Sequence, residues 1–391
     1  MTISRSLLAA VVVLMCASPA RAGQTVRDVL SFLLTNRSIP PGDFVRDQAA
    51  AAATSDTIAE LLLTELSTVP ITSSASGFTY RFDSTLGVAV RASDSFGPVF
   101  VERSLTSGRG RASIAVTFHT TSYPEIDGRS LVDGTLVSTA SWLKGEPQPF
   151  DVETVMLKIE TRTSLLSANV GLTDRLDVGV VVPLLRVSLD GSRLDVYRGT
   201  EFLQASGFAA ASGLGDIIAR GKVNLFQSGG SGIAVAAEAR FPTGDADNLL
   251  GTDRTTVTPS VIGSFEHGRA GVHGDVGYAV GGFSDEWHYR TALTFVAHSR
   301  FTVVGEVLGR RPEATVRLIE TIESHPSLVN VETVRLTSAA RPANRVTVAG
   351  GLRWNPISAW LLTATLLRPV TRDGLRSAWV PAVTVDYSFG R

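Results

Sequence analysis

Strict alternation between two kinds of side chain, from about residue 112 to the end, constrains the fold of this chain more than any other feature. Between Gly232 and Pro242, one set of alternate positions is apolar and ends at Phe241, whereas the other set includes Glu238 and Arg240. Successive residues of a strand point to opposite faces, so a period of two marks strands with two unlike faces. The sequence therefore predicts an all-β fold.

The connections between these alternating segments differ in length in a regular order. Short turns fall at 173–174, 228–231, 268–269, 298–299 and 355–358, and longer links fall between them at 191–212, 244–255, 282–286, 312–343 and 370–377. Outer-membrane barrels have short periplasmic turns and longer external loops, whereas a soluble β-sandwich has no reason to segregate its loop lengths. We therefore predict an antiparallel transmembrane β-barrel.

The predicted barrel has about twelve strands. They lie near 112–121, 152–171, 175–190, 213–227, 232–243, 256–267, 270–281, 287–297, 300–311, 344–354, 358–369 and 378–389. With an even number of strands, the start of the first strand and the end of the last strand both lie on the periplasmic side. Residues 78–91 could add a further pair, so fourteen strands is the alternative.

Aromatic residues of the apolar face gather near the strand ends. Trp354, Trp360, Tyr387, Phe389 and Phe265 stand beside short turns, and Trp287, Tyr289, Trp379 and Phe241 beside long links. Two such girdles flank the apolar band of a membrane barrel.

In two strands the alternation slips. We expect a bulge near Pro183 to restore its phase, and a similar slip occurs near Ser164–Leu166.

Composition is consistent with this class of protein and excludes others. Hydrophobic residues make up 44% of the chain and the mean hydropathy is +0.17, yet no run reaches the roughly 18 apolar residues of a spanning helix. The 36 basic and 37 acidic side chains nearly balance, which argues against nucleic-acid binding. The single cysteine, Cys16, permits neither a disulfide framework nor a cysteine-ligated metal site.

The first 75 residues differ from the rest. Residues 1–22 are predicted to be a secretory signal peptide, with Arg5 before an apolar core and cleavage before Gly23. Residues 23–75 are predicted to form a helical segment. Its second helix is expected to begin at Thr57, with Glu60 completing a capping box, and to stop at Pro70. This segment is either a plug or periplasmic element, or a packing appendage at the rim; residues 76–391 form the predicted barrel.

If the apolar face meets lipid, the polar face lines the lumen, because an arginine or lysine at mid-bilayer costs about 2–4 kcal/mol. The candidate lumen-lining residues are Lys158, Glu160, Arg162, Asp177, Asp216, Arg220, Lys222, Glu238, Arg240, His273, Asp275, His288, Arg290, Glu306, Arg345, Arg353 and Asp386. They could set a selective field along a pore, or neutralise one another inside a filled barrel. Because both signs are present, we expect neither strong anion nor strong cation selectivity.

No catalytic motif stands out. The chain has no nucleophile-elbow, zinc-protease, phosphate-loop or dinucleotide pattern. His273 and Asp275 share one strand face and could assist a lipid hydrolase, but such a pair is more often a hydrogen-bonding element of a lumen. We therefore predict no enzyme, no metal and no cofactor.

Three glycine-anchored motifs resemble a known family. They are Gly171–Gly179 followed by Val182-Pro183, Gly213–Asp216 with Lys222 after it, and Phe241–Asp245. Together they make residues from about 150 to 391 similar to the outer-membrane proteins of the MetA-pathway of phenol degradation family. The resemblance implies an outer-membrane barrel associated with uptake of aromatic or other hydrophobic compounds.

From the residues and the resemblance together, the sequence predicts a passive channel or transporter for small molecules, including hydrophobic or aromatic ones, in the outer membrane of a Gram-negative bacterium. The alternative is a closed structural or surface-interaction barrel. The expected partners are outer-membrane lipid, lipopolysaccharide, the barrel-assembly machinery and an unidentified small solute, and no nucleic acid.

Overall fold

The computed structural model describes residues 24–34, 48–67, 70–75, 77–83, 88–325, 328–357 and 359–390. The predicted signal peptide lies outside these residues. No helix among them is long and apolar enough to cross a membrane.

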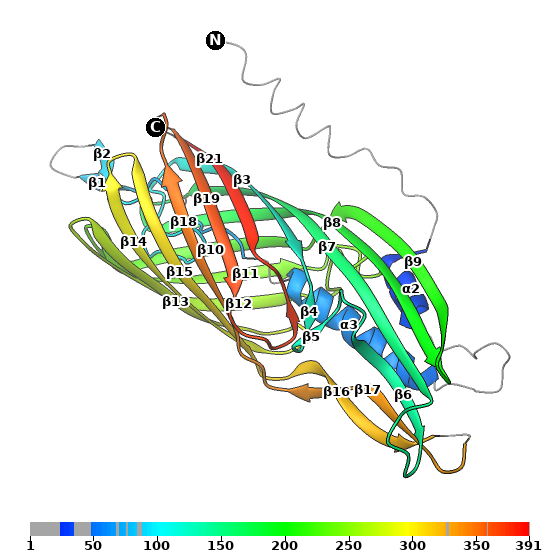
Figure 1. The fold of residues 1–391 in the computed structure, drawn as a ribbon. Coiled ribbons are helices and arrows are strands. Elements are labelled where there is room, and N and C mark those ends of the chain that lie inside the picture. Colours follow the sequence, from blue (N-terminus) through cyan, green and yellow to red (C-terminus); the bar gives the residue numbers. More distant parts are fainter. Residues whose placement is uncertain are drawn as a thin grey trace.

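Twelve antiparallel strands close into a barrel, as predicted (Figure 1). They are β3 (Arg111–Ser122), β7 (Asp151–Gly171), β8 (Leu176–Tyr197), β10 (Ile217–Ser228), β11 (Ser231–Phe241), β12 (Thr256–His267), β13 (Ala270–Ala279), β14 (Glu286–His298), β15 (Phe301–Pro312), β18 (Arg345–Trp354), β19 (Trp360–Pro369) and β21 (Val380–Gly390). The last strand closes the ring on β3, which pairs with β7. Each matches one predicted segment. The fourteen-strand alternative is wrong, because β1 (Tyr80–Asp83) and β2 (Val88–Arg91) pair with each other in a separate two-stranded sheet.

The short turns all lie at one end of the barrel. They join β7 to β8, β10 to β11, β12 to β13, β14 to β15 and β18 to β19. The start of β3 and the end of β21 lie at this end too, since Arg111 is opposite Gly390. In the usual arrangement of outer-membrane barrels this end is periplasmic.

Beyond the opposite end, a curved sheet continues from one side of the barrel (Figure 1). Its strand order is β16-β17-β6-β7-β8-β9, and we call it the extension. It is formed by the outer parts of β7 and β8 with β6 (Leu136–Leu143), β9 (Thr200–Leu214), β16 (Thr315–Ser324) and β17 (Val331–Arg341). Links 191–212 and 312–343 were expected to be loops, but both contain strands. A small separate sheet joins β4 (Glu125–Ile126), β5 (Arg129–Ser130) and β20 (Leu375–Arg376).

The predicted bulge near Pro183 is wrong. Pairing between β7 and β8 runs without a register shift from Asp151 to Gly171, and Pro183 lies opposite Leu165. The inward face of β8 stays on one parity, but it is polar at Asp177 and apolar from Leu185 to Leu189. Within the barrel this face meets the lumen, whereas in the extension it is covered by helices. The inward face of β8 therefore changes from polar to apolar where its surroundings change, whereas the alternation of inward and outward residues continues without a shift.

Two helices, α2 (Val26–Leu34) and α3 (Gln48–Ser67), pack on the inner face of the extension. A capping box begins α2: Asp28 N–H donates to Thr25 Oγ1 at 3.0 Å, and Thr25 N–H donates to Asp28 Oδ2 at 2.9 Å. The predicted capping box at Thr57 is wrong, because α3 begins nine residues earlier, at Gln48. The alanine run 49–53 has high helix propensity and extends the helix upstream.

The outer wall of the barrel is an apolar belt with aromatic margins. Val261, Val276 and Leu293 are among its exposed apolar side chains. All nine predicted girdle aromatics are exposed on this surface. Trp354 stacks on Phe301 at 6.0 Å and Trp360 lies 4.8 Å from Tyr387, measured between ring centroids, near the short turns. Such a wall is that of a membrane-spanning barrel.

Candidate functional site: the lumen

Parts of the chain between α3 and β3 lie inside the barrel: residues 70–75 and 77–79 before the β1–β2 hairpin, and residues 92–108 after it. We call these described residues together the luminal segment. Val99, Phe100 and Val101 are buried against apolar side chains of the wall, including Val304 and Ala349. From residue 92 to 108 the segment forms neither helix nor strand, so its backbone N–H and C=O groups require partners from the wall.

Carboxylates of the wall accept hydrogen bonds from the backbone of this segment. One oxygen of Glu306 accepts the N–H groups of Val99, Phe100 and Val101, at 2.9, 3.0 and 3.2 Å. Two other wall carboxylates act in the same way: Asp275 accepts the N–H of Glu102 at 3.0 Å and Asp177 accepts that of Ser107 at 2.8 Å. These acids thus bind the luminal segment and do not line an open pore.

Cations of the wall donate to the carbonyl groups of the same segment. Arg353 Nη1 donates to the carbonyls of Phe96 and Pro98, each at 2.6 Å, and to that of Gly97 at 3.2 Å. Arg220 donates to the carbonyl of Thr72 at 2.6 Å. Hydrogen bonds to charged groups contribute about 1.5–3 kcal/mol each, so the segment is held by several strong contacts.

A buried charge cluster joins the segment to β10. Glu102 Oε2 lies 3.3 Å from Lys222 Nζ, and its Oε1 lies 3.8 Å from Arg220 Nη1. Glu102 also accepts hydrogen bonds from the hydroxyls of Ser73 and Ser74. All five of these residues are nearly inaccessible to water.

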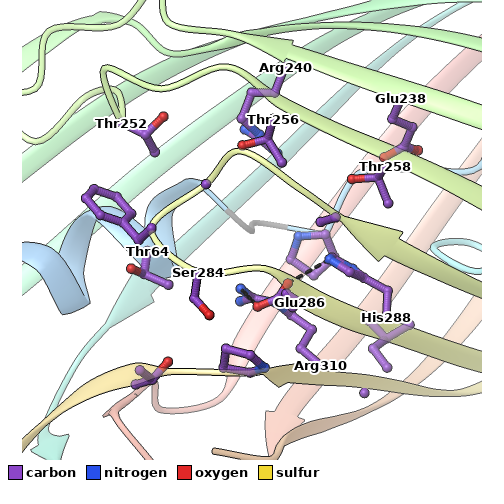
Figure 2. A pocket seen from close by; sticks show the side chains of 18 of the residues that line it. Thr64, Glu238, Arg240, Thr252, Thr256, Thr258, Ser284, Glu286, His288 and Arg310 are labelled. Carbon is purple, nitrogen blue, oxygen red and sulfur yellow. Dashed lines mark hydrogen bonds and ion pairs between the residues drawn. The ribbon is translucent and has the colours of Figure 1, made fainter. Parts of the chain in front are cut away.

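A cavity of about 140 Å³ lies between the luminal segment, α3 and the wall (Figure 2). Its apolar lining comes from Leu61, Ile71, Phe100, Ile218, Phe283 and Leu308. Its polar lining comes from Glu60, Thr64, Glu238, Arg240, Thr252, Thr256, Thr258, Ser284, Glu286, His288, Arg290 and Arg310. Burial raises the pKa of the Glu60 carboxyl above its ordinary value, and the positive charge of Arg254 partly offsets this shift.

Most charges around this cavity are paired. Glu286 contacts both Arg310 and His288 at 2.6 Å, and the second contact is the dashed line in Figure 2. Arg290 pairs with Asp275 at 2.6 Å. Arg240 is different, because it has neither a hydrogen bond nor an ion pair with any described residue.

Three of the candidate lumen-lining residues lie elsewhere. Lys158, Glu160 and Arg162 are on the outer face of the extension, where Lys158 pairs with Glu160 at 3.3 Å and its side chain is 67% exposed. Their assignment to the lumen is wrong because the odd-numbered residues of β7 face inward along the whole strand, and near Lys158 helices cover this inward face. The inward face of that stretch is the apolar one, with Leu157 and Ile159 buried against the helices.

The remaining candidates lie on the inward face. Asp216 accepts hydrogen bonds from Gly244 and Thr252 and so fixes the loop after β11. Arg345 pairs with Glu65 of α3 at 3.3 Å. Asp386 is buried within the wall.

The ring nitrogens of His273 face two hydroxyls. They lie 3.0 Å from Ser264 Oγ and 3.2 Å from Thr294 Oγ1. Asp275, the other member of the considered hydrolase pair, binds Arg290 and the backbone of Glu102 instead. Both residues therefore serve the packed lumen. Among the described residues no group of three or more histidine, cysteine or acidic side chains could hold a metal ion.

Sequence reasoning missed the luminal segment, including Glu102 and Arg103. Neither periodicity nor a motif marks it. Its one signal is the apolar run Val99–Val101 directly after Gly97-Pro98, which ends regular structure but does not say where the chain goes.

Comparison with known proteins agrees with the resemblance noted from the motifs. The sequence model of a family described as "Putative MetA-pathway of phenol degradation" matches residues 138–309. No curated protein matches the sequence.

Similar solved structures share little sequence. An outer-membrane channel from Pseudomonas putida F1 is 13% identical, with a TM-score of 0.47 over 73% of this chain and 97% of that one. The β-domain of the Bordetella autotransporter BrkA is also 13% identical, with a TM-score of 0.35 over 72% and 100%. The toluene transporter TodX of Pseudomonas putida is 10% identical, with a TM-score of 0.30 over 71% and 89%.

Proposed function

Taking as a premise that residues 138–309 carry the pattern of this family, we propose that the chain is a passive outer-membrane channel for small molecules, including hydrophobic or aromatic ones. The observation that supports it most is a mixed polar and apolar cavity of about 140 Å³ inside a closed membrane barrel. A cavity of this size in another protein holds a benzene-sized ring.

In this proposal the luminal segment is the gate. It lies between the cavity and the end of the barrel that carries the short turns, and the wall binds it through Glu306, Arg353 and Lys222. A solute enters the cavity beside α3 and passes when these contacts open. Neither a cofactor nor catalysis is needed.

The apolar belt also supports a proposal for the surroundings of the barrel. Its apolar belt meets outer-membrane lipid, and lipopolysaccharide surrounds the margin nearest the extension. Insertion would use the barrel-assembly machinery of the cell, as expected for an exported chain of this fold.

Osmotic swelling of proteoliposomes tests the proposal. Vesicles that contain the mature protein are placed in isosmotic glycine, arabinose or raffinose, which differ in size. We expect faster swelling than in protein-free vesicles for glycine and little for raffinose, because the cavity admits only small solutes.

A reversible lock supplies the matched control. Ser104 N–H donates to Ser264 Oγ at 2.9 Å, so a Ser104→Cys/Ser264→Cys pair joins the luminal segment to β12. The only natural cysteine, Cys16, lies in the predicted signal peptide. Oxidation should stop swelling and reduction should restore it. Swelling at the protein-free rate with every solute would reject a channel and favour the structural barrel.

A further inference from the structure

Arg240 differs from the other cations of the cavity. Arg290 and Arg310 also line it, but Asp275 and Glu286 pair with them at 2.6 Å. Arg240 is half-buried and has no such partner among the described residues. In Figure 2 its side chain lies beside Thr256, and no dashed line reaches it. A partly desolvated guanidinium without a partner is favourable only if an anion or water takes that place.

Neither neighbouring acid fills this role. The charges of Asp216 and Glu238 attract Arg240, but neither carboxylate forms an ion pair or a hydrogen bond with it, and Asp216 accepts hydrogen bonds from Gly244 and Thr252 instead. Glu238 stands two residues before Arg240, on the same inward face, and no ion pair forms between them. Glu238 also lines a smaller space beside Glu102 and Lys222, on the side of the luminal segment. Glu60, which also forms no ion pair with any described residue, has its pKa raised by burial, and this weakens its repulsion of an incoming anion.

The rest of the lining fits an apolar body attached to such an anion. Phe100, Phe283, Ile71, Ile218 and Leu308 form the apolar part of the cavity. The hydroxyls of Thr256 and Thr258 lie on β12, opposite Arg240 and Glu238, where they could donate further hydrogen bonds (Figure 2). A volume of about 140 Å³ admits one ring or a short chain.

We propose that this cavity binds a small amphipathic carboxylate, such as an aromatic acid, with its carboxylate on Arg240 and its apolar body against Phe100 and Phe283. Guanidinium and carboxylate form two parallel hydrogen bonds in a planar arrangement, which fixes the orientation of the ligand. This inference rests on the proposed channel function and names its solute class.

Isothermal titration of the refolded mature protein in detergent tests it with benzoate and with benzyl alcohol, a neutral analogue that carries the same ring. Benzoate should bind more tightly than benzyl alcohol. Arg240→Met keeps most of the side chain but removes the charge, so benzoate affinity should fall about 10- to 100-fold while that of benzyl alcohol changes less than about 3-fold. Arg240→Lys should retain part of the preference for benzoate.

Two variants serve as controls. Arg368→Met removes an exposed arginine that stacks on Trp379 on the outer wall, at 4.8 Å from the ring centroid, and should leave both affinities unchanged. Phe283→Ala should weaken both ligands together. The migration of each variant in unheated gels verifies its folded barrel.

Equal affinity for the two ligands, an unchanged benzoate affinity in Arg240→Met, or no benzoate binding at millimolar concentration would overturn the inference. These outcomes are separate from failure of the channel, because binding is measured without transport. A channel that swells vesicles but shows no benzoate preference would keep the proposed function and lose its solute class.

Discussion

Lys222 of the barrel wall and Glu102 of the luminal segment form a buried ion pair, with Nζ of the lysine 3.3 Å from Oε2 of the glutamate. The same ammonium donates to the carbonyl of Arg103 at 3.0 Å. One wall side chain therefore holds both a side chain and the backbone of the segment. Removing one partner of a buried pair is costly because the other charge is left uncompensated.

Lys222→Met should loosen the luminal segment. Of its two ion pairs, Glu102 would keep only the longer one, to Arg220 at 3.8 Å, and breaking a buried pair typically costs about 3–5 kcal/mol. Hydrogen exchange of the amides of residues 96–107 should become faster, and channel openings should become more frequent.

The matched control is Lys158→Met, which breaks an exposed pair with Glu160 on the outer face of the extension. Exposed pairs contribute little, so exchange at residues 96–107 should not change. Equal exchange rates in Lys222→Met and the wild-type protein would show that this pair does not hold the segment.

Leu293→Arg should destabilise the barrel in lipid. Leu293 is 65% exposed on the outer wall of β14, away from both strand ends, and an arginine near mid-bilayer costs about 2–4 kcal/mol. Ile357→Arg, at an exposed position in the turn between β18 and β19, should cost much less because it meets water. Urea unfolding in vesicles measures both. A similar loss in the two variants would contradict the assigned membrane belt.

Glu60→Gln should stabilise the protein at neutral pH but not in acid. Burial raises the folded-state pKa of Glu60 above its ordinary value of 4.5, so stability falls as the pH rises from that value through the folded-state pKa. Glutamine removes this cost. The thermal midpoint of the variant should exceed that of the wild type at pH 8, and the difference should vanish near pH 4.

Glu65→Gln is the comparison for that experiment. Glu65 lies on the same helix but pairs with Arg345 at 3.3 Å, so its replacement should bring no gain at pH 8. A stabilisation by Glu60→Gln that is equally large at pH 4 would have a cause other than the buried carboxylate.

The wall of the barrel could be predicted from the sequence because each strand carries its own pattern. Alternation at positions such as Glu238, Arg240 and Phe241 depends on local chain geometry and on the contrast between lipid and lumen. The regular order of loop lengths then fixed the topology. All twelve barrel strands could therefore be placed without knowledge of their neighbours.

The failures occurred where a face meets something other than lipid or lumen. Lys158, Glu160 and Arg162 have the composition of lumen residues, but helices cover the opposite, inward face of this part of β7. Near Pro183 the inward face of β8 also changes from polar to apolar, and in the sequence this change resembled the phase shift of a bulge. Only the packing of α2 and α3 decides these cases, and it depends on contacts between distant parts of the chain.

The luminal segment escaped prediction for a related reason. Its backbone bonds go to side chains such as Glu306 and Arg353, which lie about two hundred or more residues later. An irregular segment of this kind has no period of its own. The charges of the wall were predicted to face inward, but their occupant could not be identified from the sequence.

Planar-bilayer conductance tests the central claim, that the luminal segment closes the barrel, most directly. Three refolded chains are compared: residues 23–391, a chain without 23–75, and a chain without 23–108. The first two should show only brief, rare openings, because the contacts of Glu306 and Arg353 to residues 96–101 remain in both. The third should conduct steadily. Steady conductance of residues 23–391, or a folded chain without 23–108 that stays closed, would contradict the account.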